Sequence, residues 1–208
     1  MRIALINGSP KQGHGSSRTL LKSSVGFFPS RDDLVFVGLH DGSLNAEKKA
    51  LLLSADAWVI YFPLYVDALP SHLLSCLMAL ENEKKPKKIR LYGVCNCGFY
   101  EGKQTDCAFE VLENFALRSG LEFCGGLGIG GGGMLSMAKV LEDQKGNKLL
   151  ILGKLKRLAL AVSKGKSFGV HYTQVNIPAL MYKLGAELMW RIAVVKNGNK
   201  PWDIGRKL

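Results

Sequence analysis

Short runs of apolar, often β-branched residues alternate with longer helical segments through residues 1–166 of the chain. The five strand-like runs are "RIALIN", "DLVFVGL", "DAWVIYF", "IRLYGVCN" and "LEFCGGLGI". Each run is short and almost continuously apolar, as expected of strands buried on both faces of a sheet. Right-handed crossovers place the intervening helices against that sheet. The alternation therefore predicts an α/β fold with a doubly wound, five-stranded parallel sheet.

Several helical segments carry start or stop signals. A serine is expected to cap the first helix, Pro70 to occupy the first position of the third, and Thr105 to cap the fourth. Gly120 is expected to end that fourth helix.

The chain continues well beyond the fifth predicted strand. At 208 residues and 47% hydrophobic it can close one substantial core, so one domain with an extension is expected. The segment "IPALMYKLGAELMWRIAVVKNG" repeats apolar residues at helical spacing and predicts one extra helix. We expect a main domain over residues 1–166 and a C-terminal helical extension over 167–208. That extension belongs either to the same domain or to a dimer contact.

The charge balance favours anionic partners. A net charge of +11 suits phosphorylated cofactors, nucleic acid and acidic membranes alike. The densest basic run, "EKKPKKIR", has no stacking aromatics beside it and indicates a solvated helix end and turn, so nucleic acid is not expected. Asp56 and Lys154 interrupt the two longest apolar stretches, and no membrane span is expected.

Cysteine usage indicates a reducing compartment. The five cysteines are odd in number and unevenly spaced, and no secretory signal precedes the first strand, so the cytoplasm is expected. Cys95 and Cys97 stand closer together than the usual pair of metal ligands, and no structural zinc site is predicted. The other three cysteines are expected to be small core residues.

Ligands of an open parallel sheet bind beyond the carboxyl ends of its strands, where the winding direction reverses. The loop after the first strand, "NGSPKQGHGSSRTLL" (loop one, residues 7–21), supplies glycines, hydroxyls and a lysine at the start of a helix, a pattern that suits a phosphate. The triphosphate-binding motif fails here, because His-Gly follows Gly13 where Lys and Ser or Thr should stand. The dinucleotide fingerprint is matched only inside the late glycine run of residues 126–131, which we interpret as chance.

Two further loops at strand ends are aromatic. "FPLYVDALP" (loop two, residues 62–70) follows the third strand, and "NCGFYEG" (loop three, residues 96–102) follows the fourth. Such loops can hold the edge of a flat ring, although Tyr65 can equally pack beneath a neighbouring helix. The three loops together predict a pocket for a phosphate attached to a flat ring.

"NGSPK" with "SSRT", "FPLYVDALP", and "NCGFYEG" with the downstream "GIGGGGM" resemble the flavodoxin-like NAD(P)H-dependent FMN reductase family in order and separation. The resemblance covers about two-thirds of the chain and implies strand order 2-1-3-4-5 with bound FMN. Loop one is longer here by "QGHG". The cofactor-binding residues that the resemblance implies are Ser9, Lys11, Ser16, Ser17, Arg18 and Thr19 for the phosphate, and Pro63, Leu64, Tyr65, Val66, Asp67, Asn96, Cys97, Gly98, Phe99 and Tyr100 for the ring.

The resemblance further implies an oxidoreductase that passes electrons from NADPH or NADH through FMN to a quinone, flavin or nitro compound, and that forms a homodimer. No side chain is assigned a catalytic role, because the chemistry takes place on the cofactor. A flavodoxin-type electron carrier is the first alternative, although such carriers are usually acidic. The second alternative is a binding module whose basic face meets nucleic acid or a membrane.

Overall fold

A computed structural model describes residues 1–135 and 147–205 of the chain. The chain divides into two compact units, Met1–Val175 and Asn176–Leu208, and each is described by itself.

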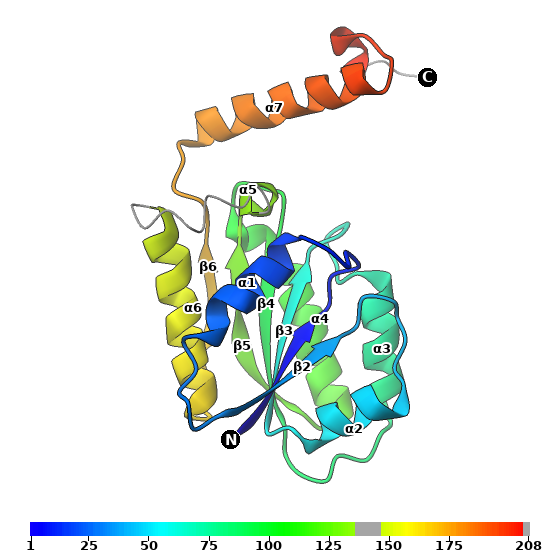
Figure 1. The fold of residues 1–208 in the computed structure, drawn as a ribbon, viewed down its shortest axis with the longest axis vertical. Helices are drawn as coiled ribbons and strands as arrows, with labels where there is room; N and C mark the ends of the chain where they lie inside the picture. The colour runs from blue at the N-terminus through cyan, green and yellow to red at the C-terminus, as the bar shows by residue number, and fades with distance from the viewer. Residues whose placement is uncertain (136–146, 206–208) are drawn as a thin grey trace. The chain divides into compact units, whose positions relative to one another are not determined.

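The first unit is built on one parallel sheet, seen in Figure 1, with strand order β2-β1-β3-β4-β5-β6. Its strands are β1 (Arg2–Asn7), β2 (Asp33–Gly38), β3 (Ala57–Pro63), β4 (Arg90–Asn96), β5 (Glu122–Ile129) and β6 (Gly169–Thr173). The predicted parallel α/β sheet is therefore confirmed, as is the order of its first five strands.

The predicted number of strands is wrong, because the described sheet has six strands rather than five. The sixth, β6, pairs with β5 at the edge of the sheet, and its "GVHYT" sequence lacks the apolar continuity of a central strand. Its pairing explains one glycine of β5. Gly125 has a φ of +106°, and a Cβ there would lie 2.1 Å from the carbonyl oxygen of Gly169.

Helices cover both faces of the sheet. The described helices of this unit are α1 (Ser16–Val25), α2 (Ala46–Ser54), α3 (Ser71–Glu81), η1 (Gly102–Thr105), α4 (Asp106–Ser119), α5 (Gly132–Leu135) and α6 (Asn147–Ser163). Helices α1 and α6 contact each other on one face, and α2, α3 and α4 share the other. Helix α1 connects β1 to β2 toward one edge of the sheet, whereas α6, on the same face, lies in the connection from β5 to β6 toward the other edge. The two crossovers therefore have opposite hands. The rule of right-handed crossovers gave no reason to expect a strand after α6.

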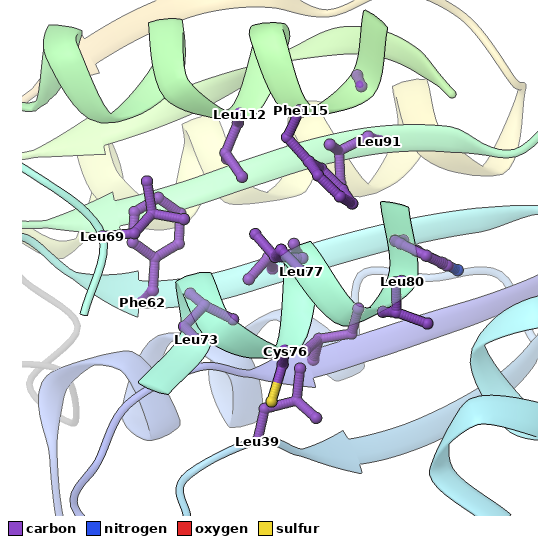
Figure 2. Close-up of a cluster of buried hydrophobic side chains, with 14 of the residues drawn as sticks. Leu39, Phe62, Leu69, Leu73, Cys76, Leu77, Leu80, Leu91, Leu112 and Phe115 are labelled. Carbon is purple, nitrogen blue, oxygen red and sulfur yellow. The ribbon is translucent and has the colours of Figure 1, made fainter. Parts of the chain in front are cut away.

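A large apolar cluster fills the space between α3, α4 and the sheet, as Figure 2 shows. Leu73, Leu77 and Leu80 of α3 lie at helical spacing and belong to the same buried cluster as Phe115 of α4. Trp58 is fully buried, and its indole N–H donates to the carbonyl oxygen of Leu52 at 2.8 Å.

The helix starts differ in detail from those expected. Gly15 rather than a serine is the N-cap of α1, and Pro70 is the N-cap of α3 rather than its first residue. Thr105 precedes α4 as predicted, but its hydroxyl donates to the carbonyl oxygen of Gly102 instead of capping. Gly120 ends α4 in the left-handed conformation, as expected.

The second unit contains helix α7 (Ala179–Lys196) and a short helix, η2 (Pro201–Gly205), which confirms the predicted C-terminal helix. Glu187 and Arg191 form an i,i+4 ion pair at 2.6 Å on α7. None of the described helices is long and apolar enough to cross a membrane. Large apolar side chains are exposed along this unit: Leu180, Met181, Leu184, Leu188, Met189, Trp190, Ile192, Val195, Trp202 and Ile204.

Candidate functional site

The three loops singled out by the sequence follow neighbouring strands. Loop one follows β1, loop two follows β3 and loop three follows β4, and these strands are adjacent in the sheet. Pro63 and Asn96 are register partners at the ends of β3 and β4. All three loops therefore leave the sheet at its carboxyl edge, and loops one and two leave it on either side of the point where the winding reverses.

Loop one presents a run of backbone N–H groups at the start of α1. Within residues 1–135 and 147–205, no group accepts a hydrogen bond from the N–H groups of residues 12–18. The first helical turn contains no acidic residue, and the side chains of Lys11 and Arg18 are exposed. Unpaired amides and the positive end of a helix dipole are the elements of an anion site.

The hydroxyls of this loop mainly hold its shape. Ser16 Oγ donates to the carbonyl oxygen of Gly132 at 2.6 Å, and Thr19 Oγ1 donates to that of Gly15 at 3.0 Å. The buried Ser9 Oγ accepts from the N–H of Lys11 at 3.3 Å. An anion at this loop would therefore meet mostly backbone amides.

The side chains of an arginine and a histidine contact backbone carbonyl oxygens of the same loop. Arg18 Nη1 donates to the carbonyl oxygen of Gln12 at 2.8 Å. His72 Nε2, from α3, lies 3.1 Å from the carbonyl oxygen of Gly8. No local sequence pattern predicts the His72 contact, since it depends on how α3 packs beside loop one.

Loop two contains a tight turn with unusual backbone angles. Val66 and Asp67 have φ values of 49° and 56°, and Tyr65 and Ala68 exchange backbone hydrogen bonds at 3.0 and 3.1 Å across the turn. Two positive φ values define a type I′ turn, for which valine is a poor residue. No described group accepts from the N–H groups of Val66 and Asp67, which lie at the tip. Val66 is 98% exposed, so packing does not account for its strained conformation.

Loop three packs against the glycine run after β5. The N–H of Gly131 donates to the carbonyl oxygen of Phe99 at 2.6 Å, and that of Gly132 to Cys97 at 2.6 Å. A Cβ on Gly130 would lie 2.0 Å from the carbonyl oxygen of Tyr100. The glycines thus admit the backbone of loop three, whose Phe99 side chain remains 53% exposed.

The cysteines of the site are buried thiols. Burial raises the pKa of Cys97, and Cys95 is fully buried with its pKa raised mainly by burial. Among the described residues, no cluster of three or more His, Cys, Asp or Glu side chains is placed to hold a metal. Cys76 and Cys124 are buried as expected, but Cys107 is exposed on α4, which corrects the expectation of a core position.

The predicted residues fall into two groups by exposure. Most are exposed or half-buried. The buried ones are Ser9, Ser17, Leu64, Asn96 and Cys97. Asn96 and Ser17 contact each other, so the structure joins residues predicted for the phosphate and for the ring.

No protein-family model and no curated protein matches this chain. Solved structures do resemble it. The Trp repressor binding protein from Bacillus subtilis superposes with a TM-score of 0.55 at 19% identity, over 75% of this chain and 96% of that one. An NADPH-quinone reductase from P. pentosaceus gives 0.56 at 15% identity, over 76% and 98%. A Streptococcus pneumonia TIGR4 flavodoxin gives 0.56 at 11% identity, over 79% and 99%. These likenesses show that the chain has the flavodoxin-like fold that its sequence predicted.

Proposed function

We propose that this protein is an FMN-dependent oxidoreductase that passes electrons from NAD(P)H through bound FMN to a small acceptor. The observation that carries the proposal is the run of N–H groups over residues 12–18, from which no described group accepts a hydrogen bond, where α1 begins at the carboxyl edge of the sheet. A phosphate monoester fits such a cradle, and the adjacent loops fit the attached ring. The flavodoxin-like fold supports the same cofactor.

The chain's own residues bind and orient the cofactor. The amides of loop one and the charges of Lys11 and Arg18 hold the phosphate. The N–H groups of Val66 and Asp67, at the tip of the turn, donate to the polar edge of the ring, while Phe99 covers part of a ring face. Bound FMN supplies hydride acceptance and electron transfer. The residues implied by the resemblance, except Asn96, remain the proposed binding set.

The donor and acceptor are proposed only by class. The net charge of +11 favours capture of NADPH, whose additional phosphate is best received by lysine or arginine, over NADH. A flat quinone, flavin or nitro compound is the proposed acceptor, since it can stack on the exposed ring face. The five free cysteines are compatible with the cytoplasm, where we place the reaction.

The net charge argues against the carrier alternative, because electron carriers of this fold are usually acidic. The second alternative, a binding module with a basic surface, is weakened by ion pairs around "EKKPKKIR". Lys87 pairs with Asp56, and Lys88 contacts Glu122 at 3.1 Å. Much of this basic run is thereby neutralised locally.

We further propose a homodimer. The exposed apolar side chains of α7 support it, because water-facing helices seldom carry so wide an apolar surface. Changing both Leu184 and Leu188 to Asp should convert the dimer into a soluble monomer, measured by sedimentation. A wild-type chain that sediments as a monomer, or a variant that remains dimeric, would contradict this interface.

Anaerobic reduction tests the proposed activity. The chain is loaded with FMN, desalted, and mixed with NADPH or NADH while the flavin absorbance is followed. Bleaching by a nicotinamide, followed by recovery of colour on addition of a quinone, is the expected result. Bleaching by dithionite alone would favour an electron carrier, and failure to retain FMN would exclude both flavin readings.

A further inference from the structure

Asn96 lies at the end of β4, the strand next to β3, which leads into loop two. Its side chain is buried, at 5% exposed. Nδ2 donates to Ser17 Oγ at 2.8 Å and to the carbonyl oxygen of Phe62 at 2.9 Å, so both amide hydrogens are used. Neither hydrogen is left for a ligand.

The two acceptors belong to different halves of the proposed site. Ser17 is the second residue of α1 and is 2% exposed, and its N–H is among those of loop one that bond to no group in the described part of the chain. Phe62 lies in β3 at the start of loop two. One carboxamide therefore fixes the start of α1 against the strand that leads into loop two.

Backbone bonds attach Asn96 to the same surroundings. Its carbonyl oxygen accepts from the N–H of Leu64 at 2.8 Å, so strand β4 is already joined to loop two without the side chain. On the other side, Ser16 bonds the carbonyl oxygen of Gly132, whose N–H in turn bonds loop three. The carboxamide of Asn96 adds the contact from β4 to the buried face of the first turn of α1.

We propose that Asn96 is a positioning residue, which sets the first turn of α1, and with it the phosphate-binding amides, at a fixed place relative to the ring loops. This inference rests on the proposed function. It gives Asn96 a role different from the direct flavin contact implied by the resemblance. Because the carboxamide holds the phosphate half of the site, its loss should weaken FMN binding more than the binding of riboflavin, which has the same ring and no phosphate.

Asn96→Asp is the sharpest variant. A carboxylate keeps the shape but has no N–H for the carbonyl oxygen of Phe62, and it places a negative charge next to the amides that would receive the phosphate. We expect the affinity for FMN to fall by about tenfold more than that for riboflavin. Asn45→Asp is the matched control. Asn45 caps α2 by accepting from the N–H of Lys48 at 2.8 Å, which aspartate does equally well, so both affinities should stay unchanged.

Asn96→Ala removes both hydrogen bonds without adding charge. It tests the positioning role of Asn96 if the aspartate variant does not fold. It should lower the FMN-to-riboflavin affinity ratio severalfold and speed amide hydrogen exchange in the first turn of α1. A general loss of stability would lower both affinities together. An unchanged ratio in a folded variant, with FMN bound by the wild type, would overturn this inference alone. A wild-type chain that binds neither flavin would overturn the proposed function and this inference with it.

Discussion

Replacing Val66 with glycine should stabilise the flavin-free protein, although it removes an apolar side chain. Val66 has a φ of 49° and is 98% exposed, so the substitution sacrifices almost no buried surface. A left-handed conformation costs an L-residue roughly 1–2 kcal/mol, and a β-branched residue lies at the upper end. Glycine avoids that cost but raises the conformational entropy of the unfolded chain, which lowers the free energy of unfolding by about 0.4–1 kcal/mol. The net expected gain is about 1 kcal/mol.

Urea or thermal unfolding of the flavin-free chain measures this gain. For a chain of this size 1 kcal/mol corresponds to a rise in Tm of about 2–4 °C. Val170→Gly is the control, because Val170 lies in β6 at an ordinary negative φ, and glycine there should lower stability by about 0.5–1 kcal/mol. A Tm for Val66→Gly below that of the wild type would refute the strained turn. FMN should bind the variant somewhat more weakly, since glycine makes the backbone more flexible and the N–H groups of residues 66 and 67 are then less well ordered before binding.

Three further outcomes are expected. Gly130→Ala should cost about 3 kcal/mol or more, because its Cβ would overlap a carbonyl oxygen of loop three at 2.0 Å, while Gly26→Ala, whose Cβ would have no atom of the described residues within 4 Å, should change denaturant unfolding little. Lys11→Glu should lower FMN affinity severalfold in titrations at low salt, and less at high salt, whereas Lys22→Glu at the far end of α1 should have little effect. Burial first, and then a hydrogen bond to a carboxylate, raises the pKa of Tyr172 to about 12, from an ordinary 10.0. As the pH rises, the unfolded state therefore loses this proton before the folded state does, so the free energy of unfolding should fall between about pH 10 and 12. It should fall less in Tyr172→Phe. An equal decrease with pH in wild type and variant would contradict the buried, hydrogen-bonded environment of Tyr172.

The central elements of the sheet could be predicted because each buried strand has its own local apolar signal. β3, for example, is apolar from Ala57 to Pro63 and is buried throughout except at its last residue. The strand β6 could not, since its five residues, GVHYT, lack the apolar run that marks the other strands. Its best signal was indirect. Gly125 in β5 made room for the backbone of Gly169, and one sequence alone does not distinguish that use of glycine from a ligand-binding turn.

That the three loops leave the same edge of the sheet also followed from the sequence, because parallel topology brings strand-end loops to one edge. The partners of individual side chains did not follow. Ser16 was predicted to face a phosphate, but its hydroxyl is bonded to Gly132, far along the chain. Asn96 was predicted to contact the ring, but its amide is bonded to Ser17 and to Phe62. Such bonds depend on tertiary packing, which leaves no local pattern in the sequence.

The most direct test of this account is a fluorescence titration of the flavin-free chain with FMN, because free flavin fluorescence changes when the ring enters a protein site. We predict saturation at one FMN per chain, with inorganic phosphate competing for the same site and riboflavin binding more weakly. No saturable binding of FMN, or equal binding of FMN and riboflavin without competition by phosphate, would contradict the claim that the start of α1 receives the phosphate of a flavin.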